Sequence, residues 1–272
     1  MIVLLLTTTL PLAFLIWTSL RRYNLTSPAG NGFVGLGNYE QIAHDSEFWD
    51  SLLRSVIYTV ATVGLQVAIG LGLALLVERI AVGRAIVRVA AIMPIMFAPV
   101  VVGLVWRTLL LTPQYGVVDF AAQKLGIGSH NWLGEPTLAF ASVIVMHTWQ
   151  WTPFAFLIFL AALATFPTEL DEAAKLDGAS AGQRFRYILL PHLRPSIVVV
   201  VIFRTVVALS AFDAIFAATG GGPGTATQIL NLYIYRVTFQ DFSIGYGSAL
   251  AVVLLFITAV VAFFFSRIRA AR

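Results

Sequence analysis

Apolar residues in this chain gather into six long runs, which are separated by shorter and more polar segments. An α-helix rises about 1.5 Å per residue, so about 20 apolar residues are needed to cross the roughly 30 Å of hydrocarbon in a bilayer. Each run meets this length, and the pattern therefore predicts an all-α polytopic membrane protein with six transmembrane helices. The predicted spans cover residues 1–20, 55–77, 85–106, 138–164, 196–218 and 246–265.

The composition agrees with this prediction. Hydrophobic residues make up 59% of the chain and charged residues only 11%, whereas about a quarter of the residues of a typical soluble domain are charged. The polar segments are too short for a second independent fold, so we expect one transmembrane domain over residues 1–272. The chain has no cysteine, which excludes disulfides, thiolate zinc sites and a thiol nucleophile.

The charge pattern predicts the orientation in the membrane. The chain carries a net charge of +4, but basic residues in a membrane protein chiefly mark cytoplasmic loops, so we expect no nucleic-acid partner. Ten of the 17 basic residues fall in the segments 78–88, 164–195 and 266–272. These loops, and with them both termini, are predicted to be cytoplasmic. Arg21 and Arg22, directly after the first span, oppose this orientation, and we expect further basic residues ahead of Met1.

The cytoplasmic segment 166–195 has the pattern of two short amphipathic helices joined at a glycine. Thr168 is the expected N-cap of the first helix, and Gly178 is placed to end it in a left-handed conformation. The second helix is predicted over 180–190, with Pro191 as its stop. Crossing the bilayer needs no such helix pair, so the segment is a candidate docking site for a cytoplasmic partner. A pair of helices resting on the lipid headgroups is the alternative.

The same segment contains Glu-Ala-Ala, then Gly after three residues, Ile after nine more, and Leu-Pro after one more. This spacing resembles the "EAA" motif of the permease subunits of binding-protein-dependent ABC importers. In that family the motif forms coupling helices that sit in a cleft of the ATPase subunit and transmit its closure to the membrane. The resemblance assigns to ATPase coupling Glu172, Ala173, Ala174, Asp177, Gly178, Ile188, Leu190 and Pro191.

Three further segments narrow the resemblance to sugar-type permeases. They are Phe-Val-Gly-Leu-Gly-Asn-Tyr at 33–39, Phe-Asp-Ala-Ile-Phe-Ala-Ala-Thr-Gly-Gly-Gly-Pro at 212–223 and Gly-Tyr-Gly-Ser-Ala at 245–249. The resemblance covers essentially the whole chain and is closest to the maltose-type, first-of-pair subunit. It implies a type I importer bundle in the cytoplasmic membrane of a bacterium or archaeon. The outer segment 39–49 is expected to form a short helix at the membrane interface.

The resemblance also implies the partners. They would be a second homologous permease, two ABC ATPase subunits, an extracytoplasmic solute-binding protein and membrane lipid. The solute would be a sugar, a polyol or a glycerophosphodiester. The chain contains no G-x-x-x-x-G-K-[ST] motif, so we expect no cofactor in this subunit, with ATP and Mg²⁺ bound by the partner ATPase.

One face of the fourth predicted span combines polar and aromatic side chains. His147, Gln150, Trp151 and Phe154 follow one another at helical spacing. An imidazole and an amide can bind sugar hydroxyls, and aromatic faces can stack on the C–H face of a pyranose ring, so we expect these residues to line a solute pathway. An aromatic belt at the membrane interface is the alternative. A lone histidine without nearby ligands is not expected to bind a metal.

Ionisable residues within predicted spans are functional candidates because they are costly at membrane depth. Arg204 and Asp213 lie nine residues apart in the fifth span, half a turn out of alignment, so they are not expected to pair. Arg204 is expected to reach into the bundle or to extend toward the cytoplasmic headgroups. Asp213 is expected to bind the backbone of Gly220–Gly222 or another span. Together with Phe212, it completes the predicted substrate pathway.

The third predicted span contains Pro94 and Pro99, and the fourth contains Pro153. They are consistent with kinked helices around an interior pathway, or with kinks of purely structural origin. A secondary transporter would be expected to show internal repeats or carboxylate relays, and an intramembrane enzyme H-E-x-x-H or G-x-S-x-G. The sequence shows no internal repeat, no carboxylate relay and no H-E-x-x-H, and its one G-x-S-x-G match, at 178–182, lies in the predicted cytoplasmic loop and not within a span. Both alternatives are therefore less favoured than an importer permease.

Overall fold

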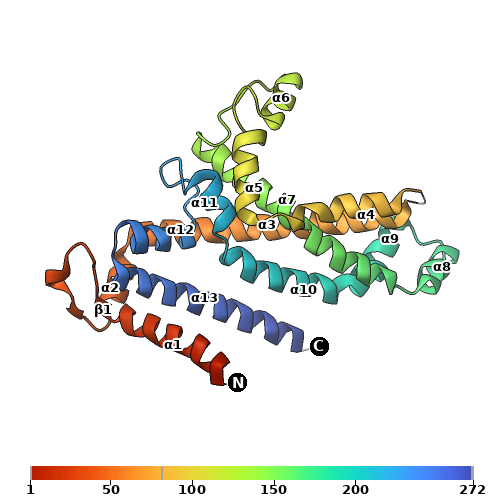
Figure 1. Ribbon diagram of the computed structural model, residues 1–272. Helices are drawn as coiled ribbons and strands as arrows, with labels where there is room; N and C mark the ends of the chain where they lie inside the picture. The colour runs from red at the N-terminus through yellow and green to blue at the C-terminus, as the bar shows by residue number, and fades with distance from the viewer. Residues whose placement is uncertain (1, 81, 271–272) are drawn as a thin grey trace.

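The computed structural model describes residues 2–80 and 82–270 and consists mainly of α-helices (Figure 1). Met1, at the start of the first predicted span, and Arg272, one of the basic residues assigned to the cytoplasm, lie outside the described residues. The long helices are α1 (Ile2–Ser19), α3 (Ser46–Arg79), α7 (Pro136–Ala164), α10 (Leu190–Leu209) and α13 (Ile244–Ala270). The shorter ones are α2 (Gly37–His44), α4 (Arg84–Ile92), α5 (Pro99–Val105), α6 (Val117–Lys124), α8 (Thr168–Leu176), α9 (Ala181–Arg184), α11 (Asp213–Thr219) and α12 (Leu230–Tyr235).

Several short turns connect these helices. The 3₁₀ turns are η1 (Pro28–Gly30) and η2 (Met93–Met96), and the π-helical turns are η3 (Trp106–Leu110), η4 (Phe185–Leu189) and η5 (Arg236–Gln240). A small antiparallel sheet pairs β1 (Arg21–Arg22) with β2 (Gly32–Phe33), an addition to the predicted all-α fold.

Four helices in the described part of the chain are long and apolar enough to cross a membrane, and a bent helix pair would supply a fifth. The four are Ser46–Arg79, Pro136–Ala164, Ala181–Leu209 and Ile244–Phe264. The 18-residue helix α1 lies where the first span was predicted. This arrangement is compatible with six predicted spans, but the third and the fifth differ from the prediction in shape.

The third predicted span is not one helix. The segments Arg84–Met96 and Pro99–Leu110 meet at an angle of 98°. Phe97 and Ala98 between them are extended, because a residue ahead of proline avoids the helical region and Pro99 itself has no N–H to continue a helix. Pro153, by contrast, leaves α7 continuous.

The fifth predicted span also ends early. α10 stops at Leu209, and α11 starts at Asp213 after an irregular step at 210–212. The side-chain amide of Asn231 donates to the carbonyl oxygens of Leu209 (3.1 Å) and Ala211 (3.2 Å), which the end of α10 leaves without helical partners. A residue far along the chain therefore stabilises a break that the apolar run 196–218 does not reveal.

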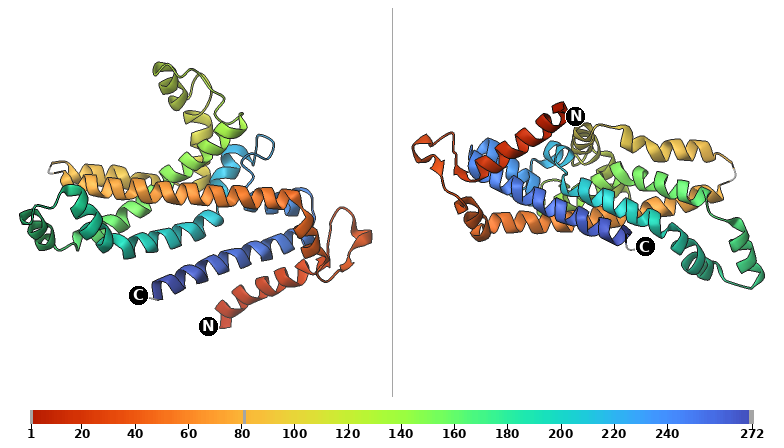
Figure 2. Two further views of the ribbon diagram at one scale, coloured as in Figure 1. Left: turned by 180° about the vertical axis from the view of Figure 1, so that it is seen from behind. Right: turned by 90° about the horizontal axis from the view of Figure 1, so that it is seen from below.

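Three helices form the centre of the bundle. α3 lies against α7 along its length, and α10 packs against both (Figures 1 and 2). The contact of α3 with α7 requires Gly70, where an added Cβ would lie 2.7 Å from the Cβ of Ala155 and 3.0 Å from the backbone nitrogen of Phe156. α1 packs on α13, and α13 on α10, so the first and last helices flank this centre (Figure 2).

At the end of the bundle that carries β1, polar contacts join distant segments. Asp45 caps α3 by accepting a hydrogen bond from the backbone N–H of Glu47 at 2.9 Å. The same carboxylate accepts from the hydroxyls of Tyr233 and Tyr246, and Glu47 forms an ion pair with Arg236. This cap starts α3 at Ser46 rather than at residue 55 and ends the predicted helix 39–49 early, at His44.

Residues 111–135 form an arm that contains α6 and extends away from the long helices (Figure 1). Its centre is Asp119, whose side chain is fully buried. The carboxylate accepts hydrogen bonds from the backbone N–H groups of Gln114 and His130 and from the side chains of Gln123, Ser129 and Trp132, at 2.7–2.9 Å. The N–H of His130 in particular holds the pKa of Asp119 well below its usual range.

Candidate functional site

The first helix of the predicted coupling loop is α8. The helix begins at Thr168 itself, while Pro167 occupies the N-cap position, so the prediction that Thr168 caps this helix is wrong. The φ of −67° at Pro167 is set by its ring, and its extended ψ makes it the last residue before the helix. Gly178 has a φ of +81°, which confirms the predicted left-handed end.

The second helix starts at a capping box and does not end where predicted. The hydroxyl of Ser180 accepts from the backbone N–H of Gln183, whose side chain accepts in turn from the N–H of Ser180. α9 then runs through η4 into α10 as one helix, Ala181–Leu209. Pro191 is accommodated because the preceding turn is π-helical, with the N–H of Leu190 bonded to the carbonyl of Phe185.

An ion-pair network joins α8 to α9 across the glycine. Asp171 accepts from Lys175 at 2.7 Å and from Arg184 at 2.6 Å. Lys175, and then Arg184, hold the pKa of the Asp171 carboxyl below its usual range. The carboxylate is therefore ionised at neutral pH, and the two helices are held together across Gly178.

The face of the loop that carries the motif is largely open. Glu172, Ala173, Asp177, Gly178 and Pro191 are exposed, and Ala174, Ile188 and Leu190 are half-buried. A hollow of about 370 Å³ is lined by Asp177, Gly178, Ala179, Gln183, Arg184, Tyr187 and Ile188. Leu176, 90% exposed, and Tyr187, 70% exposed, add apolar surface beside it. An exposed concave surface with apolar edges is suited to binding another protein.

Five of the six predicted pathway residues line one cavity of about 240 Å³. They are His147, Gln150, Trp151, Phe212 and Asp213, and they are joined by Pro99 and by Val206, Val207 and Ser210 near the end of α10. Phe154 does not line this cavity. Its ring stacks on Phe203 of α10 with the centroids 4.7 Å apart, because one further turn along α7 brings the predicted face against α10.

Gln150 reaches the break in the third predicted span. Its side chain is 1% exposed, and its amide nitrogen donates to the carbonyl oxygen of Phe97 at 3.2 Å. The amide oxygen is buried and has no hydrogen-bond partner in the part of the chain that the structure describes. Gln150 thus combines a position on the cavity wall with a structural contact at the bend.

Arg204 does not extend to the headgroups. It is fully buried, its Nε donates to Oε1 of Gln66 at 2.8 Å, and its Nη2 lies 3.0 Å from Nε2 of His147. The guanidinium carbon lies 4.4 Å from the centroid of the Trp151 ring. The role of Gln66 was not predicted. Its only signal in the sequence is a polar side-chain amide within an otherwise apolar run.

Asp213 does not bind the glycine segment. The N–H of Gly220 donates to the carbonyl of Phe216, and those of Gly221 and Gly222 donate to the hydroxyl and the carbonyl of Thr219. The backbone N–H groups of the glycine segment therefore already have hydrogen-bond partners within residues 216–219. Asp213 is exposed in the first turn of α11, where a negative charge is favourable to the helix dipole.

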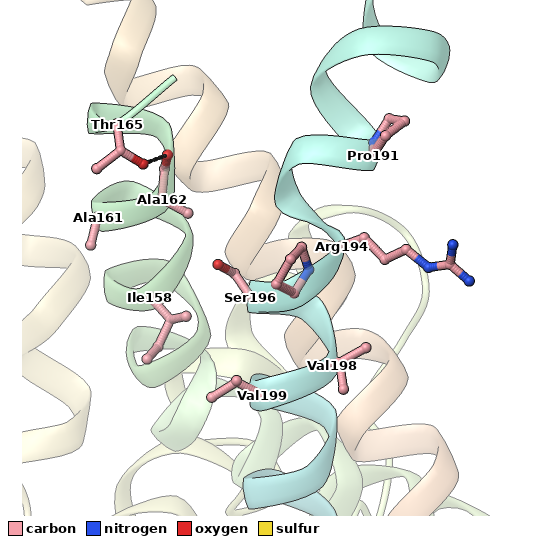
Figure 3. A pocket seen from close by; sticks show the side chains of 10 residues that line it. Ile158, Ala161, Ala162, Thr165, Pro191, Arg194, Ser196, Val198 and Val199 are labelled. Carbon is pink, nitrogen blue, oxygen red and sulfur yellow. Dashed lines mark hydrogen bonds between the residues drawn. The ribbon is translucent and has the colours of Figure 1, made fainter. Parts of the chain in front are cut away.

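A larger cavity of about 660 Å³ lies between α7 and α10, nearer to α8. Ile158 of α7 and Val199 of α10 point toward each other across it, whereas Arg194 points away from α7 (Figure 3). Its lining is mostly apolar, and it contains none of the predicted pathway residues. Within the described residues, no three His, Cys, Asp or Glu side chains form a group that could hold a metal ion.

Known proteins resemble this chain over nearly its whole length. Residues 42–271 match the family described as "Binding-protein-dependent transport system inner membrane component". The sulfoquinovosyl glycerol transport system permease protein SmoG of Agrobacterium fabrum is 38% identical, over 95% of this chain and 83% of the relative. The trehalose/maltose transport system permease protein MalF of Thermococcus litoralis is 36% identical, over 93% and 84% respectively.

Solved structures support the fold. A chain of a bacterial ABC transporter involved in the import of the acidic polysaccharide alginate has a TM-score of 0.82 at 21% identity, and the match covers 98% of this chain and 91% of that one. A chain of the MetNI methionine ABC transporter in an inward-facing conformation has a TM-score of 0.57 at 17% identity, over 82% and 94%. The chain thus belongs to the binding-protein-dependent transport system inner membrane components, the permease subunits of ABC importers.

Proposed function

We propose that this permease moves a carbohydrate or a related polar solute across the cytoplasmic membrane by alternating access. Relatives whose names include sulfoquinovosyl glycerol, trehalose and maltose support this solute class. So does the cavity at His147, where an imidazole and an amide lie beside the ring of Trp151. A second homologous permease, two ABC ATPase subunits and an extracytoplasmic solute-binding protein complete the importer.

The observation that carries the proposal is the continuity of the coupling loop with the cavity wall. One helix runs from Ala181, beside Gly178, to Leu209, and Val206 and Val207 near its far end line the cavity. A displacement of the loop at one end is therefore carried by a hydrogen-bonded rod to the solute cavity at the other. Closure of the ATPases would move α8 and α9 together, because Asp171 and Arg184 join them.

ATP and Mg²⁺ belong to the partner ATPase in this proposal, and the subunit itself catalyses no reaction.

The orientation in the membrane follows from the assignment of the coupling loop to the ATPase. The loop of α8 and α9 faces the cytoplasm, and α1 starts and α13 ends toward that side of the bundle, away from β1 and α2 (Figures 1 and 2). Both termini are then cytoplasmic.

Reconstitution of the whole complex tests the proposal. The two permeases, the ATPase and the binding protein are placed in proteoliposomes, and uptake and ATP hydrolysis are measured with trehalose, maltose, a polyol and a glycerophosphodiester. We expect at least one solute to be taken up and to stimulate hydrolysis when its binding protein is present. Uptake without ATP, or no stimulation by any of the solutes, would contradict the proposal.

A further inference from the structure

Arg204 is a fully buried cation in the centre of the bundle. No carboxylate among the described residues forms an ion pair with it. A charge without a counter-ion at membrane depth is costly, and such residues are retained where they serve a function. The neutral groups that surround Arg204 therefore indicate what this function is.

Three helices meet at Arg204. α3 contributes Gln66, whose oxygen accepts from the guanidinium at 2.8 Å and whose amide nitrogen donates to the backbone carbonyl of His147 at 3.3 Å. α7 contributes the rings of His147 and Trp151, which Arg204 contacts from α10. Both rings line the cavity, whereas Arg204 and Gln66 do not. Arg204 is thus placed behind the cavity wall and supports it.

The contact with His147 also fixes the protonation of its ring. A guanidinium offers only N–H donors, so Nε2 of His147 must accept, and the ring proton must be on Nδ1. The ring of Tyr58 packs on the same imidazole with its centroid 5.3 Å away. The imidazole is therefore held in one orientation and one tautomer, and the guanidinium holds the indole of Trp151 by a cation–π contact.

We propose that Arg204 is a positioning residue for solute binding: anchored by Gln66, it holds His147 and Trp151 in the arrangement that the solute meets in the cavity. The inference rests on the proposed function, in which the solute passes this cavity. Arg204 itself need not touch the solute. Lysine cannot replace it, because one ammonium group cannot reach Gln66 and His147 and also lie flat on Trp151.

The first test does not depend on transport. Acrylamide quenching of tryptophan emission is measured on the purified complex, and the contribution of Trp151 is obtained by difference from Trp151→Phe in each background. We expect Arg204→Met and Gln66→Leu to increase the quenching of Trp151 about twofold or more, whereas Arg107→Gln, which removes an exposed cation elsewhere, leaves it unchanged. Unchanged quenching in Arg204→Met would overturn the proposal.

The second test measures function in proteoliposomes, with a labelled form of whichever of the four solutes (trehalose, maltose, the polyol or the glycerophosphodiester) the unsubstituted complex takes up. Arg204→Met, Arg204→Lys and Gln66→Leu should each raise the half-saturating solute concentration about tenfold, while complex yield and basal ATP hydrolysis match those of Arg107→Gln. A normal half-saturating concentration in Arg204→Lys would show that charge alone suffices and would overturn the positioning role.

The two tests separate the two proposals. If the unsubstituted complex takes up none of the four solutes, the proposed solute class is in error, and the quenching comparison still decides whether Arg204 holds the ring of Trp151. If uptake is normal but Arg204→Met reduces only the yield of the complex, Arg204 is structural and the positioning role is wrong.

Discussion

The side-chain amide of Gln150 donates a hydrogen bond to the carbonyl oxygen of Phe97 at 3.2 Å. Phe97 lies at the bend between η2 and α5, where Pro99 has interrupted the helix and left this carbonyl without an intrahelical partner. A buried residue of α7 thus supports the broken span. Since Gln150 and Pro99 also line the solute cavity, the bend and the cavity wall are parts of one structure.

Replacing Gln150 with leucine should destabilise the bundle. The Phe97 carbonyl would lose its hydrogen bond from the Gln150 amide, at a cost of about 0.5–1.5 kcal/mol. Thermal unfolding of the detergent-purified complex measures this loss. Val145→Ala on the same helix is the control, since Val145 is 51% exposed and offers no polar contact to lose. Equal midpoints for the two variants would contradict the assigned role of Gln150.

Trp151→Ala should weaken uptake, because it removes the aromatic face of the cavity and the group that the guanidinium of Arg204 stacks on. Assembly and basal hydrolysis should be preserved, since the cavity already leaves one side of the ring without packing. Uptake kinetics in proteoliposomes measure the effect. Normal uptake in both Trp151→Ala and Gln150→Leu would show that this face of α7 is not part of the pathway.

Gly70 and Gly72 offer a matched pair on α3. Alanine at position 70 would place its Cβ 2.7 Å from the Cβ of Ala155, and the helices would have to separate, at a cost of about 1–3 kcal/mol. Alanine at position 72 would meet no atom within 4 Å. We expect Gly70→Ala to lower the unfolding midpoint of the complex and Gly72→Ala to leave it unchanged or slightly higher. A reversed order would exclude close packing of α3 on α7.

Gly178→Val should uncouple ATP hydrolysis from uptake while the bundle still assembles. The residue has a φ of +81° and open space around its Cβ position, so the penalty is purely conformational, about 1–2 kcal/mol. Asparagine tolerates this conformation, so Gly178→Asn should retain most of the coupling. The ratio of solute taken up to ATP hydrolysed is the measurement. An unchanged ratio in Gly178→Val would contradict the coupling role of the loop.

Asp119→Asn should loosen the arm 111–135, because an amide cannot accept all the hydrogen bonds that converge on the carboxylate. Limited proteolysis of the arm reports this change, and the control is Asp50→Asn, at an exposed position of α3.

The pH dependence of the arm follows from the lowered pKa of Asp119. The stabilisation is complete above the ordinary carboxyl value of 3.8 and is lost only as the pH falls through the lower folded value. The unsubstituted arm should therefore resist proteolysis equally at pH 7 and pH 5. Faster cleavage of the unsubstituted arm at pH 5 would contradict this ionisation.

Some features follow from local sequence alone. The lengths of the apolar runs predict where α3, α7 and α13 cross the bilayer, because hydrophobicity and helical rise act over neighbouring residues. The left-handed end at Gly178 is local in the same way, since φ is limited by the side chain of the residue itself. The family resemblance rests on such local spacings too.

Contacts between distant residues decided the rest. Nothing in the run 196–218 shows that Asn231 will stabilise an end at Leu209. Arg204 could have extended to the headgroups on an isolated helix. It is buried because Gln66, far away in sequence, and His147 supply its hydrogen bonds, and only the packing of three helices brings those groups together.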